Sequence, residues 1–219
     1  MKIIDVSRHN EIIDWEKVKS EGIDGVIIRA GFGKLVSYKD TLFETNYCRA
    51  KEVGLHIGTY WHSYASTEIE AKQEAEVFIE VIKDKKFDLP LYFDIEEKTH
   101  MNLDKKTCTA IVESFCQTVK NSGYFIGVCS LDGFFKTKLD ESIQKKYSCW
   151  VIRVDGKVPQ NCISYDMWLY SWENSINGIP YNAGMSECYK DFPTIIINAR
   201  LNGYGNDNTY HTGTEVQTV

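Results

Sequence analysis

The sequence has no long hydrophobic run and no basic stripe, and each absence excludes a class of protein. No window of its 219 residues approaches the roughly 20 consecutive apolar residues of a membrane-spanning helix. The opening MKIIDVSRHN holds no apolar segment long enough for a signal peptide. Lysine and arginine are scattered over a chain of formal net charge −6, so we expect neither a nucleic-acid nor a membrane partner. We therefore expect synthesis in the cytoplasm without a signal peptide, and any export by another route.

Motifs for metals, phosphates and nucleophilic serines are also missing. The seven cysteines show no Cys-x-x-Cys spacing, and we expect buried thiols, with one or two disulfides as the alternative. The five histidines show no metal-ligand spacing, and no serine lies in a Gly-x-Ser-x-Gly motif. GFGK at 31–34 lacks two parts of a phosphate-binding loop. The sequence therefore predicts no metal and no cofactor, and His62, although it could line a cleft, is expected to be structural.

Apolar, β-branched runs alternate with amphipathic stretches over the first 148 residues. Strands are predicted at 2–5, 25–31, 55–61, 89–94 and 124–130, and helices at 15–21, 41–53, 67–84 and 104–122. This alternation is typical of a parallel sheet, whose strands are buried on both faces. Three more strands, without long helices between them, are predicted at 149–154, 165–172 and 193–197. The fold class is α/β, a TIM-like barrel of five strand-helix units plus three further strands, (β/α)5(β)3.

The helix boundaries carry their own indications. Helix starts are predicted at Asp14, Asp40, Thr67 and Asp104, with Glu70 completing a capping box on Thr67. Helix ends are predicted where a left-handed residue would close the last turn, at Gly22, Gly54 and Gly123. The chain becomes polar and aperiodic near its end, so we expect one domain over 1–204 and a C-terminal tail or linker over 205–219.

Three acids stand where a buried strand stops, in LPLYFDIEEKTH at 89–100. Active sites of parallel barrels collect at the carboxyl ends of the strands, where Asp5 also lies, although Asp5 alone fits a helix cap equally well. Asp94 and Glu96 point to one face of an extended segment, about 6.5 Å apart along it. Glu97 points the other way and is expected to be a solvated charge. Two such carboxylates near aromatic rings have pKa values pushed apart, which glycoside hydrolysis requires.

Other residues at the predicted strand ends could contact a substrate. Arg29 ends the second strand, and Tyr60 and Trp61 end the third. Flat rings with a polar edge suit stacking on sugar faces, although about half of such aromatics would pack in the core whatever the function. The candidate substrate-binding residues are Tyr60, Trp61, Tyr92, Arg29, Trp168 and Tyr170.

Several segments resemble, in order and spacing, glycoside hydrolase family 25, the lysozymes of phage endolysins and bacterial autolysins. They are IIDVSRHN, IDWEKVKSEGIDGVIIRAGFGK, AKEVGLHIGTYWHSYA, PLYFDIE, GYFIGVCS and YDMWLYS, and CYKDFPTIIINARLNGY resembles the endolysins in particular. The resemblance spans 2–204 and implies the same (β/α)5(β)3 barrel. It also implies hydrolysis of the β-1,4 bond between N-acetylmuramic acid and N-acetylglucosamine in bacterial cell-wall peptidoglycan, after release of the enzyme to the wall.

The resemblance also implies roles for the acids. Glu96 would be the general acid, Asp94 would stabilise positive charge or orient the substrate's acetamido group, and Asp5 would support the pair. The acetamido group of the muramoyl residue can itself attack the anomeric carbon, giving retention without an enzyme nucleophile. We favour that route, while the spacing in the sequence leaves inversion open.

Three residues depart from the family's pattern. Leu169 replaces the glutamine of a Trp-Gln-Tyr motif, Cys129 replaces a tyrosine, and Gly184 stands where the family has another active-site acid, unless Glu187 or Asp191 supplies it. Two alternatives therefore stay open: a catalytically weakened peptidoglycan-binding module, and a hydrolase of another N-acetylhexosamine polymer such as chitin. A wall-binding domain, lost or separate, would follow the C-terminus.

Overall fold

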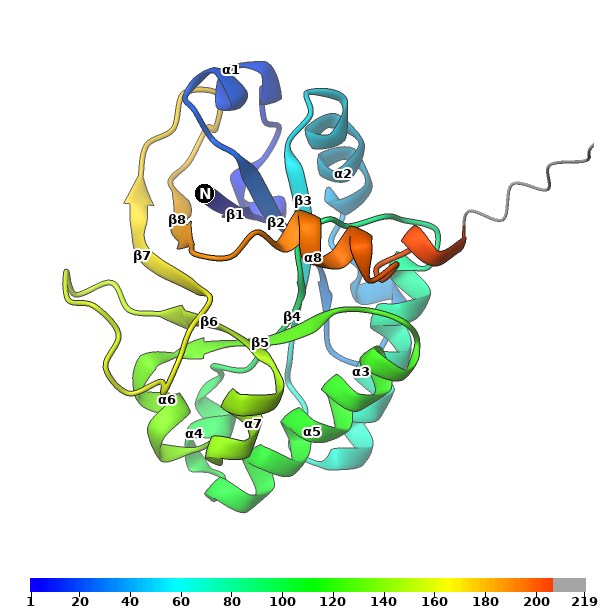
Figure 1. The fold of residues 1–219 in the computed structure, drawn as a ribbon, viewed down its shortest axis with the longest axis vertical. Coiled ribbons are helices and arrows are strands. Elements are labelled where there is room, and N and C mark those ends of the chain that lie inside the picture. The colour runs from blue at the N-terminus through cyan, green and yellow to red at the C-terminus, as the bar shows by residue number, and fades with distance from the viewer. Residues whose placement is uncertain (207–219) are drawn as a thin grey trace, which may run out of the picture.

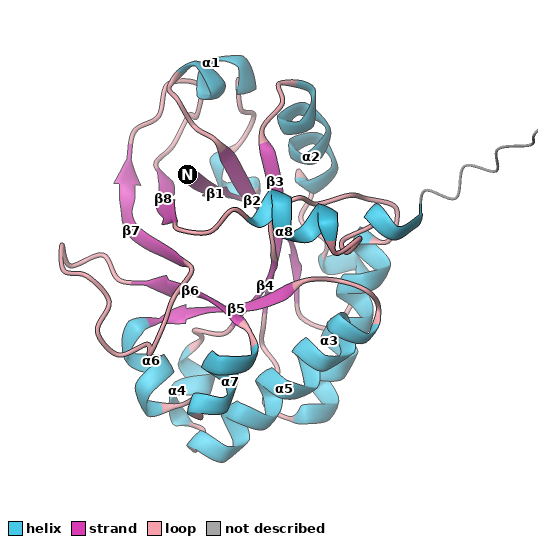
Figure 2. Cartoon of the chain, viewed as in Figure 1, coloured by secondary structure: helices cyan, strands magenta, loops and turns pink. Residues whose placement is uncertain are grey.

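The computed structural model describes residues 1–206, and in them eight strands close into a barrel with helices around it (Figures 1 and 2). The strands are β1 (Lys2–Val6), β2 (Gly25–Phe32), β3 (His56–His62), β4 (Leu91–Asp94), β5 (Ile126–Leu131), β6 (Ser148–Ile152), β7 (Met167–Asn174) and β8 (Ala183–Cys188). Neighbours from β1 to β7 are parallel, whereas β8 runs antiparallel to both β7 and β1.

Helices fill the first five connections between strands. They are α1 (Trp15–Ser20), α2 (Phe43–Glu52), α3 (Glu68–Ile82), α4 (Lys98–Asn102), α5 (Lys105–Asn121), α6 (Asp132–Thr137) and α7 (Glu141–Lys146), and α8 (Phe192–Asn198) follows the last strand. Five strand-helix units and three further strands are therefore present, and the predicted fold class is confirmed. None of the helices over residues 1–206 combines the length and the apolar character that crossing a bilayer requires.

Local capping explains most of the helix boundaries. Three predicted caps accept a backbone N–H of the first helical turn: Asp14, Thr67 and Asp104. Asp40 lies two residues before the N-cap of α2, and the Glu70 carboxylate accepts the N–H of Ser66 rather than that of Thr67, so these two predictions are wrong. The predicted C-terminal glycines all have positive φ: Gly22, Gly54 and Gly123.

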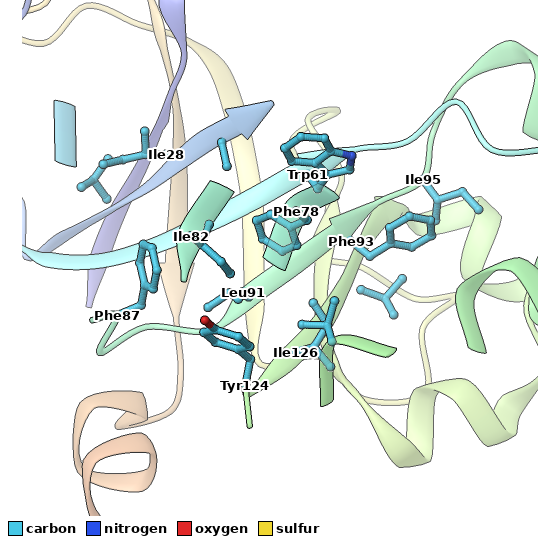
Figure 3. Close-up of a cluster of buried hydrophobic side chains, with 14 of the residues drawn as sticks. Ile28, Trp61, Phe78, Ile82, Phe87, Leu91, Phe93, Ile95, Tyr124 and Ile126 are labelled. Atoms are coloured by element: carbon cyan, nitrogen blue, oxygen red, sulfur yellow. The ribbon is translucent and has the colours of Figure 1, made fainter. Parts of the chain in front are cut away.

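Two hydrophobic cores result from the closed sheet. The larger lies between the barrel and its helices, and Figure 3 shows Trp61, Phe78 and Phe93 in it. The smaller fills the barrel, where Tyr92 is wholly buried against Trp150 with ring centroids 5.2 Å apart. The remaining described residues of this inner core include Ile3, Ile27, Leu169, Phe192 and Ile196.

Helix α8 closes the amino-terminal end of the barrel, the end that faces the viewer in Figure 1. Its Phe192 and Ile196 are buried against the inner core. Beyond the helix, the wholly buried side chain of Asn202 accepts the N–H of Phe125 at 2.6 Å and donates to the carbonyl of Leu89 at 3.1 Å. The segment after β8 therefore fastens the starts of β4 and β5.

The last predicted strand, 193–197, is wrong because these residues form α8. Asp191 accepts the N–H of Thr194, and Pro193 stands in the first turn, where its fixed φ favours a helix. Ile196 is buried while Ile195 on the same stretch is exposed, so one helix face packs inward. The true last strand, AGMSEC at 183–188, was not predicted because it has few of the β-branched and aromatic residues that strands favour.

All seven cysteines are free thiols, of which six are buried and only Cys48 is exposed. Buried thiols were predicted, and the disulfide alternative does not hold. Residues 207–219, which make up most of the predicted tail at 205–219, lie outside the described residues.

Candidate active site

Polar side chains replace the apolar filling of the barrel at the carboxyl ends of β1, β3 and β4. Asp5 and Asp94 come from the strands themselves, His62 ends β3, and Glu96 follows β4 by two residues. One nitrogen of His62 and one carboxylate oxygen each of Asp94 and Glu96 all lie within 4.8 Å of one another. The structure therefore brings together the two acids that the sequence predicted as partners, and Glu96 is half-buried rather than turned out to water.

The acids in this cluster hold their protons unusually tightly. Burial, followed by the charge of Asp94, raises the pKa of Glu96 to about 8. Burial and then the charge of Asp94 also raise the pKa of Asp5 to about 7. Glu96 is therefore mainly protonated at neutral pH and can act as a proton donor there.

His62 links two of the carboxylates. Its Nδ1 lies 2.7 Å from Oδ2 of Asp94, and its Nε2 lies 2.9 Å from Oε1 of Glu97. Burial alone would lower the pKa of His62, but the hydrogen bond and charge of Asp94, and then the bond to Glu97, raise it to about 9. At neutral pH the imidazole is therefore a cation that donates through both nitrogens.

Two predictions about these linking residues are corrected. Glu97 is not a solvated charge: it is the half-buried N-cap residue of α4, and that position turns its carboxylate toward His62. His62 was expected to be structural, yet its ring lies among the acids. Sequence reasoning missed it because a single histidine without metal spacing gives no indication of its neighbours.

Two of the predicted substrate-binding residues lie beside the acids. Tyr60 is half-buried, and burial followed by the charge of Asp5 raises its pKa well above the ordinary value. Arg29 lies on the next strand, directly opposite Tyr60 in the β2–β3 register. Its guanidinium is held by Asp40, with Nη2 2.8 Å and Nε 2.9 Å from the same oxygen.

Two other predicted contacts, Trp61 and Tyr92, are wrong because both rings are wholly buried. Trp61 points out of the barrel and packs on Phe78 with ring centroids 5.5 Å apart, as Figure 3 shows. Alternation along β3 dictates this, since the neighbours of an inward Tyr60 must face the helices. Tyr92 points inward but lies below the acids, in the inner core.

The predicted substrate contacts of Trp168 and Tyr170 are also wrong. Leu169 belongs to the inner core, so its neighbours on β7 face outward. The indole Nε1 of Trp168 donates to the carbonyl of Arg153 at 2.8 Å, and the Tyr170 ring lies 5.8 Å from the indole. Tyr170 lines a hollow on the outer surface together with Lys2. Neither ring reaches the acids.

Gly184 stands directly opposite Asp5 in the β1–β8 register, and the Asp5 carboxylate occupies the space that a side chain at this position would take. A Cβ at this position would lie 1.9 Å from Oδ1 of Asp5, so any side chain would displace that carboxylate. Glu187 does not supply the acid, because it pairs with the amino group of Met1 at 3.3 Å at the far end of β1. Asp191 does not supply it either, because it caps α8.

Cys129 stands opposite Asp94 in the β4–β5 register and is buried. Burial, followed by the charge of Asp94, raises the pKa of this thiol well above its ordinary value. The thiol is therefore neutral and adds no charge to the cluster.

A hollow with aromatic walls adjoins the acids. Phe32 and Tyr38 stack with ring centroids 5.0 Å apart, and the exposed Tyr64 meets Phe32 edge-on at 5.9 Å and His62 at 5.1 Å. Lys34 and Glu70 stand at its rim as an ion pair of 2.9 Å. Phe32 was missed because it ends β2 one residue beyond the predicted strand, and Tyr38 was missed because it lies in a short 3-10 turn that has no periodicity.

The cluster has limited suitability for a metal ion. His62, Asp94 and Glu96 are close enough to share a divalent cation, but both ring nitrogens of His62 already donate to carboxylates. An ion would have to displace one of these bonds, and we assign no metal. A protonated Glu96 beside an ionised carboxylate instead suits proton delivery to a leaving oxygen, with nearby stabilisation of positive charge.

Known proteins that are similar to this chain point to one family. The model of the Glycosyl hydrolases family 25 matches residues 4–179. An autolytic lysozyme of Clostridium acetobutylicum is 28% identical over 187 residues, which cover 85% of this chain and 55% of that protein. The uncharacterized protein YegX of Escherichia coli K12 is 28% identical over 181 residues, or 80% of this chain and 65% of that one.

Solved structures agree with the fold. The modular autolysin LytC of Streptococcus pneumoniae is 29% identical with a TM-score of 0.75, covering 84% of this chain and 46% of its own, and LytC has also been solved with a synthetic peptidoglycan ligand. A lysozyme of Streptomyces coelicolor, 22% identical, shares the fold with a TM-score of 0.76 over 91% of this chain and 96% of its own. The chain spans about half the length of the autolytic lysozyme and of LytC.

Proposed function

The chain belongs to glycosyl hydrolases family 25, and from this premise we propose that its barrel is a muramidase of bacterial peptidoglycan. It cleaves the β-1,4 bond between N-acetylmuramic acid and N-acetylglucosamine. The observation that carries the proposal is the half-buried Glu96, which keeps its proton up to a pH of about 8 beside the carboxylate of Asp94. We assign the activity to residues 1–204, with 205–219 as a tail or linker.

In the proposed reaction Glu96 gives its proton to the glycosidic oxygen as the bond from that oxygen to the anomeric carbon breaks. The acetamido oxygen of the muramoyl residue attacks the same carbon and closes a ring. Asp94, held by the cationic His62, stabilises the positive charge that the acetamido group acquires. Water, losing a proton to Glu96, then attacks the anomeric carbon and reopens the ring, with net retention.

The spacing of the acids supports retention over inversion. An inverting enzyme needs roughly 6.5 to 9.5 Å between its carboxyl groups, because a water molecule must fit between base and sugar. Here one oxygen of Asp94 and one of Glu96 lie within 4.8 Å. Asp94 is therefore better placed to support the acetamido group than to activate a separate water.

The aromatic hollow supports a polysaccharide substrate. Tyr38 and Tyr64 are 41% and 51% exposed, so their rings are free to stack on sugar. Because Tyr64 touches His62, a glycan strand bound there would continue directly into the acids. We assign to this hollow a sugar residue of the strand beyond the cleaved bond.

One observation favours a second candidate, a peptidoglycan-binding module with weakened catalysis. Gly184 offers no carboxylate where the resemblance implies one, and neither Glu187 nor Asp191 replaces it. Binding to purified sacculi without release of reducing ends would favour this second candidate.

Mass spectrometry of digested peptidoglycan tests the first candidate. We expect soluble fragments with N-acetylmuramic acid at the reducing end. Fragments ending in N-acetylglucosamine would contradict the proposed bond, and faster release from chitin oligomers than from peptidoglycan would contradict the proposed polymer.

A further inference from the structure

We propose that His62 is a positioning residue of the catalytic centre, whose imidazolium holds Asp94 and Glu97 together and so fixes the carboxylate beside Glu96. The proposal rests on the muramidase function and adds a residue to it. His62 does not touch the reacting atoms: it acts through Asp94.

The two carboxylate oxygens of Asp94 differ in their hydrogen bonds. Oδ2 accepts from Nδ1 of His62 at 2.7 Å, whereas Oδ1 is buried and has no hydrogen-bond partner. A buried carboxylate oxygen without a partner is costly unless a ligand completes it. The hydrogen bond from His62 to Oδ2 is therefore the contact that fixes the direction of this carboxylate.

The backbone that carries His62 is also held by hydrogen bonds. The next residue, Ser63, donates its backbone N–H to the carbonyl of Asp94 at 3.0 Å, and its hydroxyl donates to the buried carboxylate of Glu74 at 2.7 Å. Two residues further on, the carbonyl of Ala65 meets Nε2 of the buried His100 at 3.0 Å. The segments after β3 and β4 are thus tied at several points, and the His62 ring itself is held by its bonds to Asp94 and Glu97.

The charge of His62 also acts on the proton donor. Charged and titratable groups face His62 and Glu96 from β1, β2, β3, α3, β4, α4 and β5. They are Asp5, Arg29, Tyr60, Tyr64, Glu74, Asp94, Glu97, His100 and Cys129. Within this set His62 opposes the carboxylates, because its positive charge lowers the pKa of Glu96 that burial and Asp94 raise. Removing the cation must therefore let Glu96 keep its proton to higher pH.

The test is His62→Gln, which keeps a donor amide but removes the charge and one of the two bonds. We expect kcat to fall by about 10², the effect of a loosened catalytic group, with a smaller change in KM. We also expect the alkaline limb of kcat/KM, near pH 8 in the wild type, to move to higher pH. A residue that serves folding alone would lower the amount of active enzyme without moving that limb.

Strand β3 offers a matched control. His56 pairs through Nδ1 with Oδ2 of Asp88 at the opposite end of the same strand. His56→Gln should leave kcat, KM and the alkaline limb unchanged. A second variant, Glu97→Gln, keeps the His62 ring and weakens only one side of the clamp, so it should show a smaller loss in kcat than His62→Gln.

Nitrogen NMR of the imidazole side chains gives a readout that does not need turnover. In the wild type at pH 7.5, His62 should carry protons on both nitrogens, and Glu97→Gln should move its titration to lower pH. A neutral His62 at that pH overturns the proposal. So does an active wild type whose His62→Gln variant keeps both kcat and the alkaline limb, while a wild type that releases no reducing ends overturns the muramidase function instead.

Discussion

Strand β3 begins and ends with a histidine paired to an aspartate, and the two pairs differ in their surroundings. At the amino-terminal end both oxygens of Asp88 accept hydrogen bonds, one from His56 and one from the N–H of Ile57 at 2.7 Å. At the carboxyl end Asp94 keeps one buried oxygen without a partner. The same pairing thus involves both carboxylate oxygens of Asp88 at one end and only Oδ2 of Asp94 at the other.

The rest of the barrel follows this division. The amino-terminal end is covered by α8 and held by the side chain of Asn202, which accepts one hydrogen bond and donates another. The carboxyl end holds Asp5 and Glu96, whose pKa values are raised by burial and by like charge. In parallel barrels chemistry collects at the carboxyl ends of the strands and stability at the other ends. The sharpest experiments are therefore those that change one end and monitor both properties.

The largest effect is expected at the proton donor. Glu96→Gln should lower kcat on peptidoglycan by about 10² to 10⁴, because the amide cannot protonate the leaving oxygen. Release of reducing ends measures it. Asp88→Asn, at the opposite end of the barrel, serves as the control and should keep full kcat. Comparable turnover in wild type and Glu96→Gln would remove Glu96 from the reaction.

The next largest effect is expected at the amino-terminal end of the barrel, on stability rather than on activity. Asn202→Ala should lower the free energy of unfolding by about 3 kcal/mol, since it strands the N–H of Phe125 and the carbonyl of Leu89 inside the protein. Its φ of 54° adds to the cost, because alanine adopts this region less readily than asparagine. Urea unfolding measures the loss, and kcat per folded molecule should not change. A large loss of kcat in the folded fraction would show that the two ends are not independent.

The features of these two ends could be predicted from the sequence to different degrees. The strand that carries Asp94 could be predicted because an apolar run stops at acids, and the positions of Asp14, Thr67 and Asp104 fixed three helix starts through local hydrogen bonds. Such features depend only on neighbours along the chain. The fold class followed from their alternation.

What could not be predicted depends on contacts between distant residues. His62 and Glu97 are 35 positions apart, and only the pairing of β3 with β4 brings their side chains together. Trp61 was predicted to contact sugar because it stands near a strand end. Side chains alternate between the two faces of β3, however, so Trp61 faces away from Tyr60 and packs in the outer core. The run of isoleucines at 195–197 favoured a strand locally, yet the cap at Asp191 and packing on the barrel end made a helix.

The pH dependence of stability should come from the carboxyl end. Glu96, Asp5 and His62 have pKa values raised to about 8, 7 and 9, so the folded chain holds protons that the unfolded chain releases at lower pH. The free energy of unfolding should therefore fall as pH rises from about 5 to about 9. Urea unfolding across this range measures it. Glu96→Gln should flatten the curve, whereas Asn202→Ala should lower it without changing its slope, and equal slopes in all three proteins would contradict the assignment.

The smallest effect is expected in the aromatic hollow at the carboxyl end of the barrel, and the control residue again lies at the amino-terminal end. Tyr64→Ala should raise KM for long glycan strands about 3- to 10-fold, because one stacked ring contributes about 1 kcal/mol, and kcat should stay nearly constant. Tyr189 is the matched control, since it is 54% exposed but follows β8 at the amino-terminal end. Tyr189→Ala should leave KM unchanged. If both variants raise KM equally, the loss reflects general surface contact with the wall. If only Tyr64→Ala raises KM, and only on glycan strands long enough to extend past the acids, the hollow binds a defined sugar residue of the substrate.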